Sequence, residues 1–540
     1  MAESARSLRP MGSPTAAGSE TGPIRSVGAM GRTVGRGLSW LLLASLVVKL
    51  ASLGNQAVLG WVLAEDDFGV FGAAIGVAAL VNVLREGGVR RILIQKGAHR
   101  FDGLIGPVYA IAVLLNLLAA GVLVALGPVL ARYHDNPEYV PVMGTLGAAA
   151  AIFAPALIYR AKLAMDFRYK AIAALNTASS IVRYATMIAL ALAGAGPLTF
   201  TVSLVAVALF EWAFGLAVTR DPLIRLRVKR RLWPAILART KWLIAGALAL
   251  ALLRQGDFLV LGFLLDERIL GVYVFAYMLG EQAHALIATN LQQVLMPAMA
   301  AFNRDAGRHA ASVLRASRAL AVAASVLAGG VTVGIAPLEQ LIWQGKWQDA
   351  VPAVQIISLC FALRLLVSVQ ESALSSSGRF RLQFVALLAQ GLGMVATAVL
   401  AGSLFPDDPA AIAACIGGFF VFGVTAVSAW SVGRLGVPVA EFLRSVLAPW
   451  GTVAIIAVAA VTVDAYLANA LVELAPPGGG LAGWLHPAGR LLAIGGVFGL
   501  ATALALRVLF PGILADVLNV APARVAALAR RVLVLPSARM

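Results

Sequence analysis

The sequence predicts an all-α protein that crosses a membrane many times, and two observations carry that prediction. The chain has 540 residues, of which 60% are hydrophobic and 13% charged, and its mean hydropathy is +0.87. A water-soluble domain cannot bury so much apolar surface. Apolar segments of about 20 residues, the length of a helix that crosses a bilayer core, recur from Gly37 to Pro511. We therefore expect a polytopic membrane protein.

Taken in order, the apolar segments predict about 14 membrane-spanning helices. Their expected starts are Gly37, Gly69, Ile105, Val140, Ala171, Leu198, Trp242, Gly271, Leu314, Val351, Leu382, Ala410, Phe442 and Arg490. Acidic and basic residues alternate between successive loops. Because Lys and Arg accumulate in cytoplasmic loops, this pattern predicts that both termini are cytoplasmic.

An internal repeat divides the chain. Residues 59–71 (LGWVLAEDDFGVF) match residues 261–273 (LGFLLDERILGVY). Each copy ends one apolar segment, crosses a short acidic turn and begins the next. An even number of predicted spans separates the copies, so the two units are expected to be parallel and related by an axis along the membrane normal. We expect two six-helix lobes, 36–220 and 242–435, and two additional helices in 436–511.

The remaining segments are polar or basic. Residues 1–35 lack apolar periodicity and are expected to form a disordered cytoplasmic tail, so that Met30 is an alternative start to Met1. Residues 221–241 are expected to be a basic cytoplasmic linker, and 512–540 an amphipathic cytoplasmic tail. The net charge of +17 lies in short loops, which favours anionic membrane lipids over nucleic acid as partners.

Catalytic motifs are missing from the sequence. It contains no Walker loop, no HExxH and no paired-cysteine motif, and Cys360 and Cys415 fall within predicted spans, as small core residues do. We expect a transporter with no cofactor and no metal, rather than an enzyme.

Four cations are predicted to lie near the middle of the membrane. They are Lys49, Arg183, Arg254 and Arg364. Charged residues at this depth are costly and usually face a bundle interior or a hydrated cavity. A cavity with this excess of positive charge would bind an anionic cargo such as a phosphate or pyrophosphate, which arginine holds in a bidentate manner.

Each cation also has a structural interpretation. Arg254 and Asp257 are three residues apart on one helix and would neutralise each other. Arg183 would pair with Glu211 of the next span. For Arg364, cavity lining and a buried ion pair remain equal alternatives. Lys49 has no acidic residue near it in sequence, so cavity lining is favoured there.

The eighth predicted span is the most polar. Glu281, His284 and Gln292 fall on one side of it. Titration of Glu281 or Asp257 would couple transport to protons or sodium ions. Hydrogen bonding between helices is the equally favoured alternative.

Several segments together resemble a known family, the bacterial polysaccharide exporters or oligosaccharide flippases of the Wzx type. The first segment, residues 63–96, holds Glu65-Asp66-Asp67-Phe68-Gly69, Arg85-Glu86-Gly87-Gly88 and Leu93-Ile94-Gln95-Lys96. The second half adds Leu270-Gly271-Val272-Tyr273, Leu295-Met296-Pro297-Ala298 and Trp343-Gln344-Gly345-Lys346-Trp347. The resemblance covers about residues 33–435. Arg85 beside Glu86 departs from the family pattern.

The resemblance implies a transporter of the superfamily that includes multidrug exporters and the peptidoglycan-precursor flippase. Two six-helix lobes would surround a central cavity and work by alternating access. The expected cargo is an undecaprenyl-pyrophosphate-linked oligosaccharide, moved from the inner to the outer leaflet of the bacterial plasma membrane. Its product would serve exopolysaccharide, capsule or O-antigen synthesis, with a polysaccharide polymerase and export machinery as partners.

Two other functions fit the sequence less well. A cation-coupled multidrug exporter of the same superfamily fits the fold, but cationic drugs favour an acidic cavity and the midplane cations count against it. A membrane glycosyltransferase or polymerase would need a large extramembrane loop for its chemistry, and every predicted outer loop is short.

Overall fold

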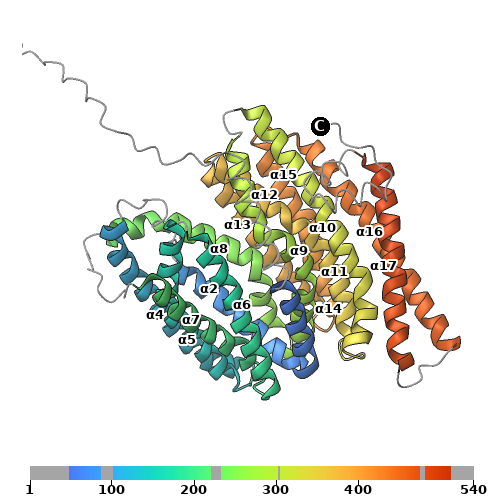
Figure 1. Ribbon diagram of the computed structural model, residues 1–540, viewed down its shortest axis with the longest axis horizontal. Coiled ribbons are helices and arrows are strands. Elements are labelled where there is room, and N and C mark those ends of the chain that lie inside the picture. Colours follow the sequence, from blue (N-terminus) through green and yellow to red (C-terminus); the bar gives the residue numbers. More distant parts are fainter. Residues whose placement is uncertain are drawn as a thin grey trace, which may run out of the picture. The chain divides into compact units, whose positions relative to one another are not determined.

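The computed structural model describes residues 48–86, 101–166, 168–220, 233–301, 305–474 and 481–511 (Figure 1). Regular structure in these ranges is helical throughout. Eleven of the helices in the described ranges are long and apolar enough to cross a membrane, which confirms an all-α polytopic membrane protein. The expected tails 1–35 and 512–540 lie outside the described residues.

The N-terminal half consists of a helix over 48–62 followed by five long helices. These are α2 (Glu65–Glu86), α4 (Phe101–Tyr133), α5 (Tyr139–Met165), α6 (Tyr169–Leu192) and α7 (Leu198–Thr219). α4 packs along α5, and α7 packs against both α5 and α6. Every one of these helices begins within a few residues of a predicted span, except the first, whose predicted start at Gly37 lies outside the described residues.

The C-terminal half has six further spans, two of which are interrupted. They are α8 (Trp233–Leu264), α9 (Glu267–Ala301), α10 (Ala306–Ile342), α11–α12 (Val351–Phe361 and Leu365–Ser376), α13 (Phe380–Leu404) and α14–α15 (Pro409–Gly418 and Thr425–Gly433). α8 packs against α13, and α9 against α11 and α12. α8 begins at Trp233 rather than at Trp242, so the last part of the expected linker is helical; residues 221–232 lie outside the described ranges.

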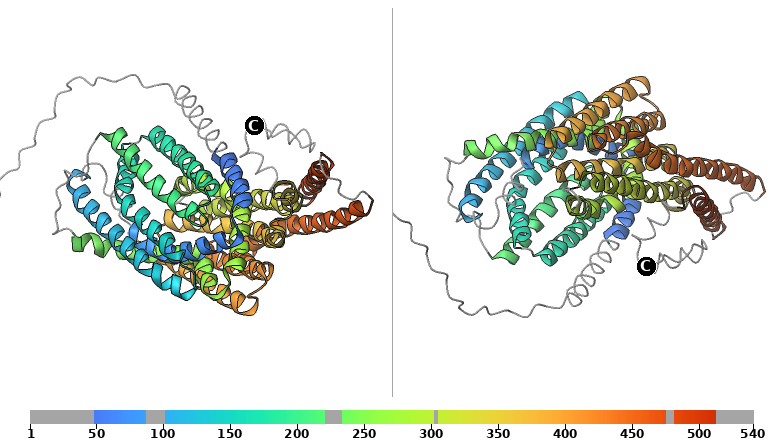
Figure 2. Two further views of the ribbon diagram at one scale, coloured as in Figure 1. Left: turned by 90° about the horizontal axis from the view of Figure 1, so that it is seen from below. Right: turned by 90° about the horizontal axis from the view of Figure 1, so that it is seen from above.

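Two additional helices follow, α16 (Val439–Leu474) and α17 (Leu481–Leu509), and both pack against α10. The views in Figure 2 place them on the side of the C-terminal half away from α4. Arg490 of α17 joins Asp464 of α16 through two hydrogen bonds, 2.9 and 2.8 Å long, and also donates to Gln340 of α10 at 2.8 Å. The arginine and the aspartate are both buried.

Of the predicted spans that start within the described residues, two, α6 and α9, are not among the eleven apolar helices. Their polar residues explain the difference, because α6 contains Arg183 and α9 contains Glu281 and His284. Both helices still pack within the bundle, α6 against α7 and α9 against α2 and α11.

The two copies of the sequence repeat lie against each other. A Cβ atom added to Gly69 would lie 1.9 Å from the backbone oxygen of Glu267, and one added to Gly271 would lie 1.8 Å from the backbone oxygen of Glu65. Only glycine permits so close an approach. Because Gly69 and Gly271, like Glu65 and Glu267, occupy equivalent positions in the two copies, the contact is reciprocal.

Candidate functional site

The two halves of the chain contact each other at one end of the bundle. The short acidic turns of both copies of the repeat lie at this end. The Lys346 ammonium donates hydrogen bonds to the backbone oxygens of Trp61, at 3.0 Å, and Leu63, at 2.6 Å. The last carbonyls of a helix have no partner within it, and a cation there is favourable. Arg268 and Glu65 form an ion pair of 2.5 Å nearby, exposed to solvent on the arginine side.

Tryptophans of the same segment as Lys346 close this end further. The indole nitrogen of Trp343 donates to the backbone oxygen of Ala57 at 3.0 Å, and that of Trp347 to Gly60 at 2.8 Å. The rings that pack against Trp347 or against one another come from both halves of the chain: Phe68, Phe71, Phe200 and Phe275. The result is a buried aromatic cluster across the junction.

Two helix irregularities meet at Arg364. Ala362–Arg364 form a 3₁₀ turn between α11 and α12, and residues 419–424 form a π-helical segment between α14 and α15. Irregular turns inside long helices are often found at functional sites. The Arg364 guanidinium lies over the Phe361 ring at 5.2 Å and the Phe420 ring at 5.6 Å.

Arg364 is buried and bonded rather than open to a cavity. It donates hydrogen bonds to the Tyr277 hydroxyl, at 2.7 Å, and to Glu281, at 3.3 Å. A buried charge without such partners would be strongly unfavourable. The structure therefore favours the ion-pair interpretation of Arg364 over direct cavity lining.

Asp257 does not pair with Arg254, contrary to the neutralisation considered from their spacing. Its carboxylate instead accepts a hydrogen bond from the Tyr273 hydroxyl at 2.9 Å, and it is 1% exposed. The second carboxylate oxygen has no hydrogen-bond partner among the described residues. The Arg254 backbone oxygen accepts a hydrogen bond from the Tyr277 hydroxyl at 3.1 Å. The side chain of Arg254 is exposed.

Three of the four predicted cations lie around one part of α9. Lys49 is close enough to Glu281 for their charges to interact, and His284 interacts electrostatically with Lys49, Arg254 and Arg364. Among the ion pairs of the described residues, only the Arg364 pair involves one of these three cations. Lys49 and Arg254 thus contribute positive charge without a bonded carboxylate in the part of the chain that the structure describes.

Arg183, the fourth predicted cation, lies on α6 with an exposed side chain. Its proposed partner Glu211 is taken by Arg160, which donates two hydrogen bonds to the carboxylate, of 2.8 and 2.5 Å. The pairing of Arg183 with Glu211 was wrong because α5 and α6 both reach α7, and Arg160 of α5 faces the carboxylate.

The two tyrosines of the buried network were missed by the sequence reasoning. Tyr273, Tyr277 and Glu281 recur every four residues, which places them on one face of a helix. This spacing was the signal that could have found them. Phe71 is the residue equivalent to Tyr273 in the other copy of the repeat. Because phenylalanine has no hydroxyl, the hydrogen bond of Tyr273 has no counterpart there.

No three His, Cys, Asp or Glu side chains gather in the described part of the chain. Cys360 and Cys415 are free and partly buried. The site therefore consists of cations, hydroxyls and two carboxylates.

Comparison with known proteins agrees with this picture. The Lipopolysaccharide biosynthesis protein WzxC of Escherichia coli (strain K12) is 20% identical over 352 residues, 64% of this chain and 71% of that protein. The solved structure of the Lipid II flippase MurJ, in an inward closed conformation, matches with a TM-score of 0.65 at 12% identity. That match covers 87% of this chain and 99% of MurJ.

A second solved structure is an inward-facing multidrug resistance transporter of the MATE family, in the MOP superfamily. It matches with a TM-score of 0.57 at 16% identity, over 73% of this chain and 98% of the transporter. At such identities the two structures establish the fold alone. Both matches agree with the predicted all-α polytopic membrane fold. A family model described as Polysaccharide biosynthesis protein matches residues 58–352, more than half of the chain, and the protein belongs to that family.

Proposed function

We propose that this protein is a flippase for an undecaprenyl-pyrophosphate-linked oligosaccharide. It would move the cargo from the inner to the outer leaflet of a bacterial plasma membrane, by alternating access of lobes 36–220 and 242–435, to supply surface polysaccharide synthesis. Membership of the polysaccharide biosynthesis family supports a role in the synthesis of surface polysaccharide. The fold shared with a lipid flippase supports the transport step.

The observation that carries the proposal is a pair of cations beside α9, Lys49 and Arg254, that have no carboxylate partner among the described residues. An arginine facing lipid at mid-membrane is costly, so the exposed, unpaired Arg254 is expected to face a hydrated cavity instead. Lys49 lies in the same electrostatic neighbourhood. A pyrophosphate carries the negative charge that such a cavity lacks, and charge-assisted hydrogen bonds to it are strong. Arg183 is proposed to serve the same cavity from α6.

The closed end of the bundle fits one state of an alternating-access cycle. Its loops carry the acidic residues that the charge pattern assigns to the outer side. Closure there, by Lys346, the tryptophans and the reciprocal glycine contact, would leave the cargo site accessible from the cytoplasmic side. Outward opening would require these contacts to separate.

Asp257 and Glu281 are proposed to couple transport to protons or sodium ions. Asp257 is buried with one carboxylate oxygen unpartnered among the described residues, and Glu281 bonds Arg364. A proton or a sodium ion at either carboxylate would alter the field at the cations beside it. Asp257→Asn keeps the shape of the side chain, so it should leave assembly intact while removing any dependence of transport on the ion gradient.

The proposed function is tested by extracting lipids from a deletion strain. We expect the complete oligosaccharide on undecaprenyl pyrophosphate to accumulate on the cytoplasmic side while surface polysaccharide disappears. A truncated sugar chain on the carrier would instead indicate a transferase. Unchanged lipids and unchanged polysaccharide would refute the flippase.

The role of the cations is tested with Lys49→Ala combined with Arg254→Ala. We expect export to be lost at normal protein level, because neither side chain is bonded to a carboxylate in the described structure. Arg315→Ala combined with Arg444→Ala is the matched control, since both arginines are exposed and outside the α9 group. Full export in the first double variant would exclude the cation role.

The alternative is a cation-coupled multidrug exporter, which the similarity to the MATE transporter favours only at the level of the fold. A drug exporter predicts that deletion sensitises cells to cationic drugs and leaves polysaccharide untouched. The flippase predicts the reverse pattern.

A further inference from the structure

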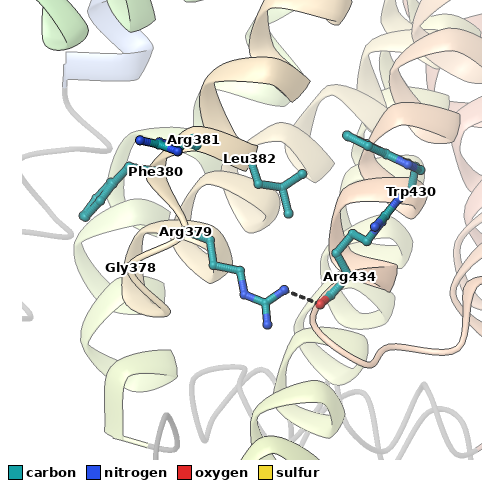
Figure 3. A pocket seen from close by; sticks show the side chains of 7 residues that line it. All are labelled: Gly378, Arg379, Phe380, Arg381, Leu382, Trp430 and Arg434. Atoms are coloured by element: carbon teal, nitrogen blue, oxygen red, sulfur yellow. Dashed lines mark hydrogen bonds between the residues drawn. The ribbon is translucent and has the colours of Figure 1, made fainter.

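A pocket of about 620 Å³ lies where the turn between α12 and α13 meets the end of α15. Figure 3 shows the residues that line it: Gly378, Arg379, Phe380, Arg381, Leu382, Trp430 and Arg434. The turn depends on Gly378, whose φ of +71° is unfavourable for other residues. This pocket is separate from the cations around α9, and the transport proposal assigns it no role.

Three arginines make the pocket strongly positive. Arg379, Arg381 and Arg434 are all exposed, and none takes part in an ion pair with a carboxylate of the described residues. The Arg379 guanidinium donates to the backbone oxygen of Arg434, as Figure 3 shows, which fixes it at the mouth of the pocket. Arginines that line one pocket without a carboxylate partner among the described residues favour an anion with several oxygens.

The start of α13 adds to this charge. Phe380–Leu404 is a 25-residue helix whose N-cap, Arg379, makes no side-chain capping bond. The first turn of α13 contributes Phe380, Arg381 and Leu382 to the lining of the pocket, and the helix dipole favours negative charge at this end.

Exposed aromatic and aliphatic side chains distinguish a lipid from a soluble anion as the occupant. Phe380 is 65% and Trp430 42% exposed, and tryptophan is enriched at the membrane–water interface. Exposed apolar residues continue along α13: Val385, Leu392, Val399 and Leu400. An acyl chain could lie along this surface while its headgroup meets the arginines.

We propose that this pocket binds the phosphate headgroup of an anionic phospholipid, with the acyl chains along α13. Figure 3 shows Arg381 directed away from Arg434. Because Arg381 is exposed, it would turn toward Arg434, so that the headgroup phosphate accepts hydrogen bonds from both while Arg379 adds its charge. The site depends on the protein being in a membrane and is independent of which cargo is transported.

Native mass spectrometry of the detergent-purified full-length protein tests the proposal, with phosphatidylglycerol as probe and phosphatidylcholine of the same chains as comparison. We expect a retained phosphatidylglycerol molecule that phosphatidylcholine does not replace. Arg381→Gln combined with Arg434→Gln should weaken its retention about tenfold or more, because two charge-assisted hydrogen bonds are removed. Arg381→Lys combined with Arg434→Lys, which keeps the charge, should retain most of the binding.

Arg315→Gln combined with Arg444→Gln removes the same charge from exposed positions outside the pocket and should leave retention unchanged. Equal loss in this control would show a general charge effect and overturn the site. Retention of phosphatidylcholine as strong as that of phosphatidylglycerol would do the same. Displacement by millimolar inorganic phosphate, or a preference for a polyprenyl pyrophosphate, would contradict a phospholipid occupant.

Discussion

Gly69 and Gly271 occupy equivalent positions in the two copies of the repeat, and each lies against the backbone oxygen that the other copy presents from its equivalent glutamate. The contact is thus repeated across the local pseudo-twofold axis. α2 also crosses α8 closely, with Gly76 against the Phe258–Leu259 backbone. Small residues allow backbones to approach in this way within membrane bundles.

Substituting either glycine should open this junction. A Cβ at Gly69 or Gly271 would meet a backbone atom rather than a flexible side chain, so the helices must move apart. We expect Gly69→Ala or Gly271→Ala to cost about 1–3 kcal/mol, the usual range for overpacking. Thermal unfolding in detergent measures the loss. Accessibility of Leu63→Cys to an impermeant maleimide, in a variant lacking Cys360 and Cys415, measures the opening.

Gly144→Ala is the matched control for that experiment. Gly144 lies within α5 and has nothing within 4 Å of its added Cβ. There the change should be neutral or stabilise by up to about 1 kcal/mol, because alanine has the higher helix propensity. If Gly144→Ala lowers the thermal midpoint as much as Gly69→Ala or Gly271→Ala, the close backbone contact is not the cause of the destabilisation.

The ion pair between Arg268 and Glu65 should contribute far less than the glycines beside it. Its short distance suggests strength, but the Arg268 side chain is 62% exposed, and exposed pairs are screened by water and salt. We expect Arg268→Gln to leave the thermal midpoint unchanged within error, at both low and high salt. A clear destabilisation that high salt suppresses would contradict this ranking.

The membrane fold could be predicted largely from the sequence, because span length and loop charge are local properties. Each predicted span corresponds to helix in the described ranges, and residues 59–71 and 261–273 each hold the end of one helix and the start of the next, as their sequences predict. That the two copies touch was not predictable, since it depends on how helices distant in sequence pack. The start of α8 at Trp233 was also missed, because its basic first turns lack the apolar signal of a span.

Site partners were harder to predict than site residues. Counting residues from the ends of the predicted spans placed Lys49, Arg254 and Arg364 at a similar depth in the membrane. In the structure, all three are close enough to His284 for their charges to act on it. The alternative in which Asp257 neutralises Arg254 was wrong, because helix spacing gives neighbours on one helix only. Tyr273 of the next helix reaches that carboxylate instead.

His134 provides a prediction on pH. It lies in the turn between α4 and α5, where burial lowers its pKa below the usual 6.5, and its ring stacks on Tyr139 at 4.7 Å. The unfolded chain then binds a proton more readily than the folded one, so stability falls as the pH falls through this range. We expect the thermal midpoint to fall between about pH 7.5 and 5.5, and His134→Gln to reduce that fall. An identical pH profile in the variant would show that other groups are responsible.

The attachment of the last two helices gives the largest expected effect on stability. Arg490 and Asp464 are 7% and 3% exposed and bond each other through both carboxylate oxygens. Removing one partner leaves the other charge buried without compensation, so Arg490→Met should cost about 3–5 kcal/mol. Replacing both, as Arg490→Met with Asp464→Leu, should recover most of that loss, because apolar side chains need no partner there. Gln340 is exposed and can turn to water after either change.

A double-mutant cycle measures the coupling between Arg490 and Asp464. It compares the thermal unfolding of the unmodified protein, the two single variants and the double variant, together with the protease sensitivity of the α16–α17 region. A double variant as unstable as the single one would mean that packing, rather than charge pairing, holds α16 and α17 to α10.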